Sequence, residues 1–380
     1  MSAIARGPRA LQVQLRPLAY FPISCHFCAV SSQLFSTSAP TRQSRRHAPS
    51  SVPSTSINSK LKSLRHEINP PKSTLPADLD LPPPSSTTAT SSDKLKRYVA
   101  LGRAYLAFYK TGLKNVFGNY RASIPLRKEL GLPAFLPISP PRRASAPTSP
   151  SSSSLSAGTS APIGLSRAQF QLVRRSARDV RRMIPFTVIL IVCGEFTPLI
   201  VPIVGAAITP ATCRIPSQVA KERATAATRK SAALTAHATA VDGSLTPAPA
   251  GSDDELRLLA TRLANPGWAA TAESAAVQRA CAVFGLVKHH NQRAGSLLVA
   301  PVYRSRLVRH LEYLALDDGM IRAEGGVSAL DAVEVRIAVE ERGGVDVAAG
   351  ARDSARAEEL DRLWLERWLT IRENETAQTV

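Results

Sequence analysis

Acidic residues are missing from the whole front of this 380-residue chain, in which Glu67 is the first. The stretch before it holds nine Lys and Arg among many Ser and Ala. An Arg-rich segment without acids is typical of a mitochondrial transit peptide, and Pro17 and Pro22 interrupt the apolar core that a secretory signal needs. We predict a transit peptide over residues 1–40, and a merely disordered basic tail is the alternative.

The signatures of common enzymes are also lacking. The chain has no phosphate-binding glycine loop, no H-E-x-x-H and no G-x-S-x-G, and its five cysteines make neither a disulfide framework nor two C-x-x-C pairs. Asp317-Asp318-Gly319 lacks the alternating ligands and closing Glu of a calcium loop, so a turn is expected there. The prediction is a protein that is not an enzyme, with no catalytic residue, cofactor or metal site.

Two stretches rich in Pro, Ser and Thr, residues 41–92 and 139–165, are predicted to be disordered linkers because they cannot bury enough apolar surface to fold. Between them, residues 93–138 place aromatic and aliphatic side chains at helical spacing among Lys and Arg. This pattern is typical of an amphipathic helix near a membrane. It fits an ordinary core helix equally well, and both interpretations remain open.

The longest apolar run covers residues 184–208, in which Glu195 is the only charged side chain. About 20 apolar residues suffice to cross a bilayer, so the run is predicted to be a single transmembrane helix; a buried helix of a soluble protein is the alternative. Glu195, Pro198 and Pro202 fall on one helical face, and Pro185 stands just inside the entry. These four are candidate functional residues. Glu195 either belongs to a cation or proton path, or it is a neutral structural residue that bonds to the carbonyls left free by the prolines or to another protomer.

A basic amphipathic helix is predicted over residues 166–183, directly before the apolar run. Ser166 and Gln169 have the spacing of a capping box at its start. Cations beside a membrane gain about 1 kcal/mol each from anionic lipid. We therefore predict a basic collar at the membrane surface, formed by Arg174, Arg175, Arg178, Arg181 and Arg182.

The rest of the chain, residues 209–380, is predicted to be an all-α domain. Capping boxes at Ser252 with Glu255 and at Ser328 with Asp331 mark two helix starts. Trp364 and Trp368 are expected in the core or an interface. Residues 1–250 carry 32 Lys and Arg against 9 Asp and Glu, whereas residues 251–380 carry 16 against 20. Residues 251–380 are therefore not built to bind RNA through bulk charge.

The central stretch reads RSARDVRRMIPFTVILIVCGEFTPLIVP and resembles the LETM family of leucine-zipper, EF-hand-containing transmembrane proteins. Two later segments, HLEYLALDDGMIRAEGGVSAL and LDRLWLERWL, resemble that family's ribosome-binding domain, a helical fold likened to 14-3-3. The chain has no complete EF-hand and no long terminal coiled coil, so calcium sensing is not implied. The positions that match the family's central motif are Asp179, Pro185, Phe186, Glu195, Phe196, Pro198 and Pro202.

This resemblance implies a single-pass protein of the mitochondrial inner membrane whose C-terminal domain lies in the matrix. The implied function is to bind mitochondrial ribosomes, through ribosomal proteins more than RNA, and to support translation, membrane insertion and ion and volume homeostasis. Inner-membrane lipid is the second implied partner, and a homo-oligomer is left open. The rival function is a component of a K⁺/H⁺ or Ca²⁺/H⁺ exchanger that acts through Glu195.

Overall fold

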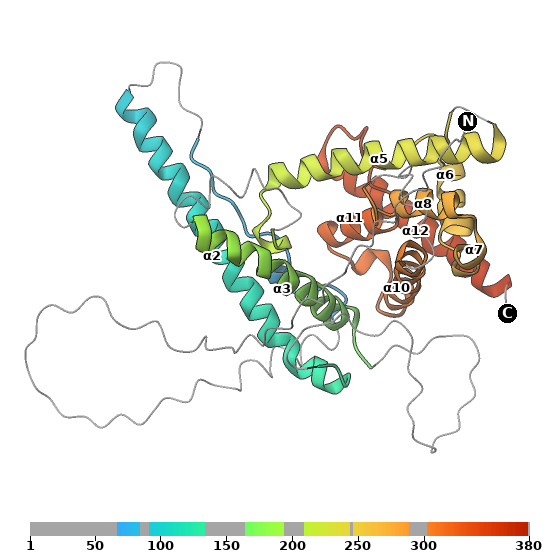
Figure 1. Cartoon of the computed structure of the whole chain (residues 1–380), viewed down its shortest axis with the longest axis horizontal. Coiled ribbons are helices and arrows are strands. Elements are labelled where there is room, and N and C mark those ends of the chain that lie inside the picture. Colours follow the sequence, from blue (N-terminus) through green and yellow to red (C-terminus); the bar gives the residue numbers. More distant parts are fainter. Residues whose placement is uncertain are drawn as a thin grey trace, which may run out of the picture. The chain divides into compact units, whose positions relative to one another are not determined.

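A computed structural model describes residues 67–83, 91–133, 164–193, 209–243, 246–288 and 302–378 (Figure 1). Over these ranges the chain is mostly helical and contains no strand, which confirms the all-α prediction. The α-helices are α2 (Ser91–Glu129), α3 (Arg167–Cys193), α5 (Pro216–Asp242), α6 (Asp253–Arg257), α7 (Pro266–Thr271), α8 (Ser274–Val283), α10 (Arg304–Ala323), α11 (Ala332–Glu341) and α12 (Ser354–Gln378). Shorter pieces are η2 (Lys72–Thr74), η4 (Ala211–Cys213), the π-helix η5 (Leu258–Leu263) and η7 (Val327–Ala329).

The basic helix and the start of the apolar run form one continuous helix. Helix α3 begins at Arg167, passes through Pro185 and ends at Cys193. Glu195, Pro198 and Pro202 lie outside the described residues, as do the predicted transit peptide and most of the two predicted linkers. Among the described helices, none is both long and apolar enough to cross a membrane.

The core of the C-terminal part forms where the helices from α6 to α12 bring their apolar stripes together. Leu259 and Leu263 of η5, Leu307 and Leu311 of α10 and the tryptophans of α12 belong to one buried cluster. The rings of Trp364 and Trp368 stack with centroids 5.5 Å apart, and both are buried. Their predicted place in the core is thereby confirmed.

Two local predictions are wrong. Asp317, Asp318 and Gly319 lie inside α10 instead of forming a turn, and both carboxylates are buried. Their charges are compensated by arginines from other helices, so tertiary contacts override the local turn preference. Helix α11 starts after Asp331 without a side-chain cap, and the Ser328 hydroxyl donates to the Gly325 carbonyl instead.

The other predicted caps are present in whole or in part. The backbone N–H of Gln169 donates to Ser166 Oγ, and that of Ser166 donates to Gln169 Oε1, each at 3.3 Å, which confirms the capping box. Ser252 Oγ accepts from the Glu255 N–H as predicted. The Glu255 carboxylate accepts from the Gly251 N–H and pairs with Lys230.

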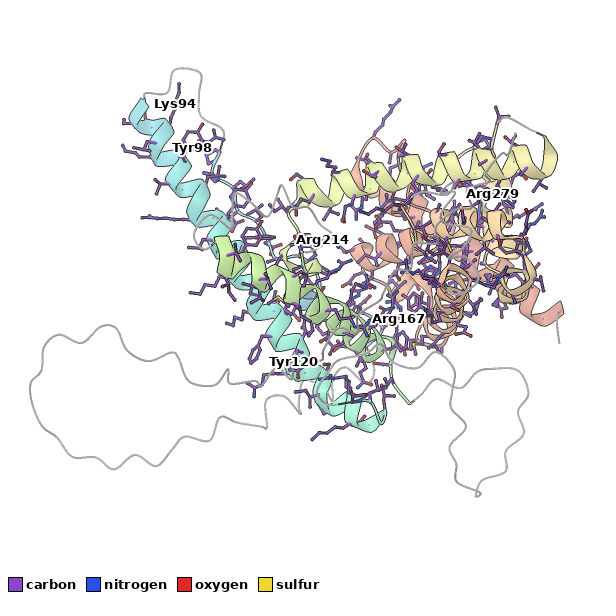
Figure 2. All side chains as sticks on the ribbon, in the orientation of Figure 1. Lys94, Tyr98, Tyr120, Arg167, Arg214 and Arg279 are labelled. Carbon is purple, nitrogen blue, oxygen red and sulfur yellow. The ribbon has the colours of Figure 1, made fainter. Side chains whose placement is uncertain are left out.

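Helix α2 combines a packed part and an exposed part. Phe108, Tyr109 and Leu126 are buried, and α2 lies beside α3 along this later part. Leu95 and Tyr98 on the first turns are 65% and 70% exposed. Figure 2 shows Tyr98 near the start of α2 and Tyr120 where α2 runs beside α3. The core interpretation is therefore correct for the later part of α2, and the membrane interpretation stays a prediction for the first part.

Two glycines of α2 offer a matched test of its packing. A Cβ at Gly112 would lie 2.6 Å from Cys213 Sγ and 2.8 Å from the Thr212 carbonyl oxygen, whereas one at Gly118 would meet nothing within 4 Å. Gly112→Ala should lower the free energy of unfolding by about 1–3 kcal/mol, the usual cost of overpacking. Gly118→Ala should raise it by up to about 1 kcal/mol, because Ala favours helix over Gly. Chemical denaturation of both variants checks this, and equal shifts would contradict the close approach at Gly112.

Candidate functional site

Helix α3 presents two different faces, and its sequence dictates both. Ala168, Leu172 and Val173 pack with Leu126 in a buried cluster against α2. Residues spaced by three and four share a helical face, so the polar side chains of α3 gather on another side. These side chains are Arg167, Gln171, Arg174, Arg175 and Arg178, and all five contact α10 or α11. We call their contacts with α10 and α11 the charged junction.

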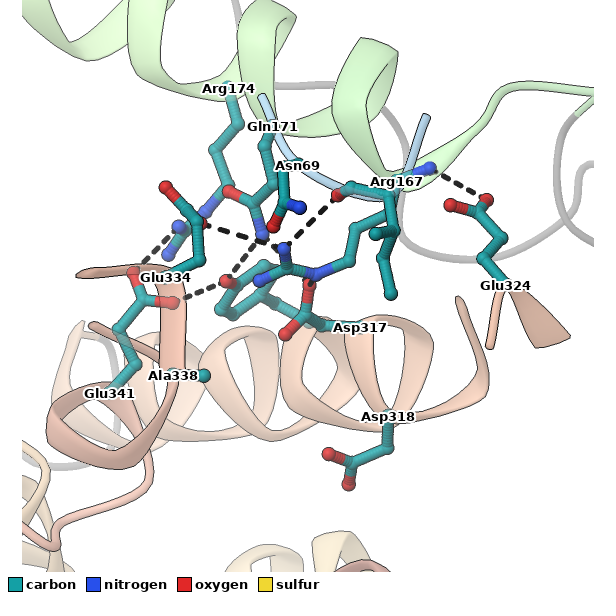
Figure 3. A network of polar contacts seen from close by, with 12 residues as sticks. Asn69, Arg167, Gln171, Arg174, Asp317, Asp318, Glu324, Glu334, Ala338 and Glu341 are labelled. Atoms are coloured by element: carbon teal, nitrogen blue, oxygen red, sulfur yellow. Dashed lines mark hydrogen bonds and ion pairs between the residues drawn. The ribbon is translucent and has the colours of Figure 1, made fainter. Parts of the chain in front are cut away.

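Two arginines of the charged junction converge on one carboxylate of α11. Arg175 donates to Glu334 through both terminal nitrogens, at 2.7 and 2.8 Å. Arg167 donates through Nε to Asp317 Oδ1 at 2.9 Å, and its NH1 lies 3.5 Å from Glu334 Oε2 (Figure 3). Arg167, Asp317 and Glu334 are almost completely buried. Bidentate pairing fixes direction as well as distance, so α3 is held in one orientation here.

A second contact of the charged junction joins Arg174, Tyr313 and Glu341. Arg174 donates to Glu341 Oε1 at 2.8 Å, and its guanidinium carbon lies 3.5 Å from the centre of the Tyr313 ring. The Tyr313 hydroxyl donates to the same carboxylate and accepts from Gln171 Nε2 at 2.9 Å. The Phe170 ring stacks on the Tyr313 ring and adds an apolar contact beside these polar ones. The aromatic ring and the carboxylate thus bind one guanidinium from two directions.

Two acids of the charged junction, Asp317 and Glu341, are held in their charged form. Burial alone would raise the pKa of Asp317, but the positive charges of Arg167 and Arg342 outweigh burial and lower it. Burial would likewise raise the pKa of Glu341, and Arg174 reverses this and lowers it. Each carboxylate is neutralised by a guanidinium at hydrogen-bond distance. The arrangement is therefore a fixed attachment of α3 to α10 and α11.

Asp317 extends this attachment into the centre of the C-terminal helices. Its second oxygen accepts from Arg342 NH2 at 2.9 Å, and the same nitrogen donates to Asp318 at 2.6 Å. Asp318 also accepts from Trp368 Nε1 at 3.2 Å. Arg342 and its two acids are buried, so the positions of α3, α10, α11 and α12 depend on one another.

The structure places the five arginines of the predicted collar in different surroundings. Arg174 and Arg175 belong to the charged junction, and pairing with Glu341 and Glu334 gives them a role that the sequence did not predict. The Arg178 side chain is 43% exposed and lies 3.7 Å from Glu341. Arg181 is exposed and Arg182 is partly exposed. For these last three the lipid collar stays a prediction.

Helix α5, which follows the apolar run, has an ionic attachment of its own. Lys230 is buried and pairs with Glu255 at 2.7 Å and with Asp346. Arg223 donates to Glu340 of α11. The helices on both sides of the apolar run are thus fixed to the same set of C-terminal helices.

Pro185, a further candidate residue, lies at an exposed position within α3. The acids of α10 and α11 that complete the charged junction were missed by sequence reasoning. One signal was present: Asp318 continues the spacing of the apolar positions Leu307, Leu311 and Leu314, which places a charge on a core stripe.

No protein-family model, curated protein or solved structure matches this chain.

Proposed function

We propose that the chain is a mitochondrial inner-membrane protein of LETM type, anchored through residues 184–208, that holds a helical ribosome-binding domain at the membrane in the matrix. One observation carries the proposal: the two ends of α3 have opposite surroundings. Its first half is fixed in the charged junction, whereas its last turns expose Ile184, Val188, Ile191 and Val192, between 56% and 78% each. Exposed aliphatic side chains on successive turns favour transfer into lipid.

The charge of the C-terminal helices supports binding to protein more than to RNA. Of the four cations of α5, Lys230 is buried, Arg223 is paired with Glu340 and Arg229 is partly buried, which leaves Lys221 exposed. RNA binders usually present a continuous basic face. The proposed partners are therefore ribosomal proteins and the basic segments of newly made chains, with a 14-3-3-like arrangement of helices as the binding domain. Support for translation, membrane insertion and ion and volume homeostasis follows from that position.

Two measurements test this proposal. The intact protein should remain in the pellet after carbonate extraction of mitochondria, because an inserted apolar run resists high pH, and it should co-sediment with detergent-solubilised mitochondrial ribosomes. A variant without residues 184–208 should leave the membrane pellet but still co-sediment with ribosomes, since α5 to α12 are retained. Release of the intact chain by carbonate would refute the anchor. Absence of co-sedimentation for both forms would refute the ribosome contact.

A further inference from the structure

The segments on either side of the apolar run touch one another. Asp179 precedes the run in α3, and Ala211 follows it in η4. The Ala211 backbone N–H donates to Asp179 Oδ1 at 2.9 Å, and Asp179 is buried. This hydrogen bond places the Asp179 carboxyl of α3 directly against the backbone of η4.

Further contacts surround this hydrogen bond. Cys213 of η4 is buried in a cluster with Phe108 and Tyr109 of α2, against which Met183 of α3 packs. The Thr212 hydroxyl donates to the Gly112 carbonyl at 3.1 Å, and this close approach depends on the missing side chain of Gly112. The segment η4 is therefore packed against α2 and α3, and its position does not depend on a single hydrogen bond.

Both flanks are also attached to the same C-terminal helices. Helix α3 is held through Arg175 and Glu334, and α5 is held through Lys230 and Glu255. All four side chains are buried, or nearly so. Separating such a pair leaves an uncompensated charge and typically costs 3–5 kcal/mol. Two independent attachments thus keep the flanks together.

A single crossing of the membrane is incompatible with these contacts. It would place Asp179 and Ala211 on opposite sides of roughly 30 Å of hydrocarbon. We propose instead that the segments before and after the apolar run, which meet at Asp179 and Ala211, lie on the same face of the membrane. This inference rests on the proposed membrane anchor. It replaces the single-pass topology with an attachment in which α3 and α5 share one compartment.

The first turns of α2 supply a second contact with the same face of the membrane. Leu95, Tyr98 and Leu106 lie on one helical face and are each more than 60% exposed. Lys94, Lys96 and Arg103 are exposed on the same turns. Exposed aliphatic and aromatic side chains bordered by cations suit the headgroup layer of an anionic membrane, whereas RNA would gain little from the leucines.

Protease protection with two tags tests the inference. One tag is inserted between Ser153 and Ser154, in the linker before α3, and the other follows Val380. In mitoplasts with an intact inner membrane, both tags should be protected, and detergent should make both digestible. Digestion of one tag and protection of the other would overturn the inference and leave the membrane anchor standing. Release of the tagged protein by carbonate would instead refute the anchor, and the inference with it.

Chemical labelling avoids the inserted tags. Arg181→Cys and Lys221→Cys place thiols at exposed positions before and after the apolar run. Each variant is labelled with a membrane-impermeant maleimide, and the labelling of the parent chain is subtracted. When detergent is added, the remaining signal should change by the same factor for both variants. A rise for one position alone would contradict a common side. Vesicles that contain anionic lipid should bind the full chain more strongly than vesicles without it. Equal binding would refute the proposed contact of α2 with lipid headgroups.

Discussion

Replacing Arg342 by methionine is expected to lower the free energy of unfolding by about 3–5 kcal/mol, the usual cost of breaking a buried ion pair from one side. Arg342 is completely buried and donates to Asp317 and Asp318. Methionine fills much of the same volume but leaves Asp318 without a cationic partner. The expected result is a lower melting temperature of the full chain in detergent, followed by circular dichroism at a helical wavelength.

Two further variants make this expectation specific. Arg356→Met removes a cation whose partner is Glu359, in a pair that is more than half exposed, and it should cost less than about 1 kcal/mol. Asp318→Asn in the Arg342→Met background removes the unpaired charge while keeping an oxygen for Trp368 Nε1. The double variant should therefore be more stable than the sum of the single effects predicts. Strict additivity would show that the buried charge is not the source of the loss.

The sequence predicted helices well where the signal is local. Apolar spacing and the reciprocal bonds of Ser166 and Gln169 identified the start of α3 to within one residue. The core position of Trp364 and Trp368 followed from the same periodicity. These features depend on side chains within two turns of one another, which a single sequence displays directly.

The candidate site could not be predicted because its partners are far apart in the chain. Arg175 and Glu334 are separated by 159 positions, so nothing in the local sequence distinguishes a lipid-facing arginine from one that pairs inside the protein. For Asp317 and Asp318, in contrast, the local sequence predicted a feature that does not form. Their local preference for a turn lost to burial against Arg167 and Arg342.

The proximity of Asp179 and Ala211 was hidden for a related reason. Hydropathy reports that residues 184–208 prefer lipid, but not whether the chain emerges on the far side. The hydrogen bond from Ala211 to Asp179 and the packing of η4 on α2 supply that information. Gly112, which permits this packing, has no distinguishing local pattern, because a glycine inside a helix signals at most a small loss of helix propensity.

Replacing Glu334 by glutamine is expected to loosen α3 from α10 and α11. The Glu334 carboxylate accepts a hydrogen bond from each terminal nitrogen of Arg175, and its Oε2 lies 3.5 Å from Arg167 NH1. An amide has nearly the same shape but cannot neutralise Arg175, which is mostly buried and also donates to Thr74. The free energy of locally detaching the turns of α3 around Arg175 should fall by about 3–5 kcal/mol. Arg167 keeps Asp317, so the first turn of α3 should be affected less than the turns around Arg175.

Hydrogen exchange separates this local effect from general unfolding. Amides of α3 near Arg175 should exchange faster in Glu334→Gln, while amides around Trp364 and Trp368 keep their protection. The reason is that, among the described residues, Glu334 pairs directly only with Arg167 and Arg175 of α3. Glu359→Gln, at an exposed pair on α12, is the matched control and should leave both regions unchanged. Unaltered protection of α3 in Glu334→Gln would mean that its apolar contacts with α2, through Leu172 and Val173, suffice to hold it. The charged junction would then not be what fixes α3, and its role in positioning the C-terminal helices at the membrane would be refuted.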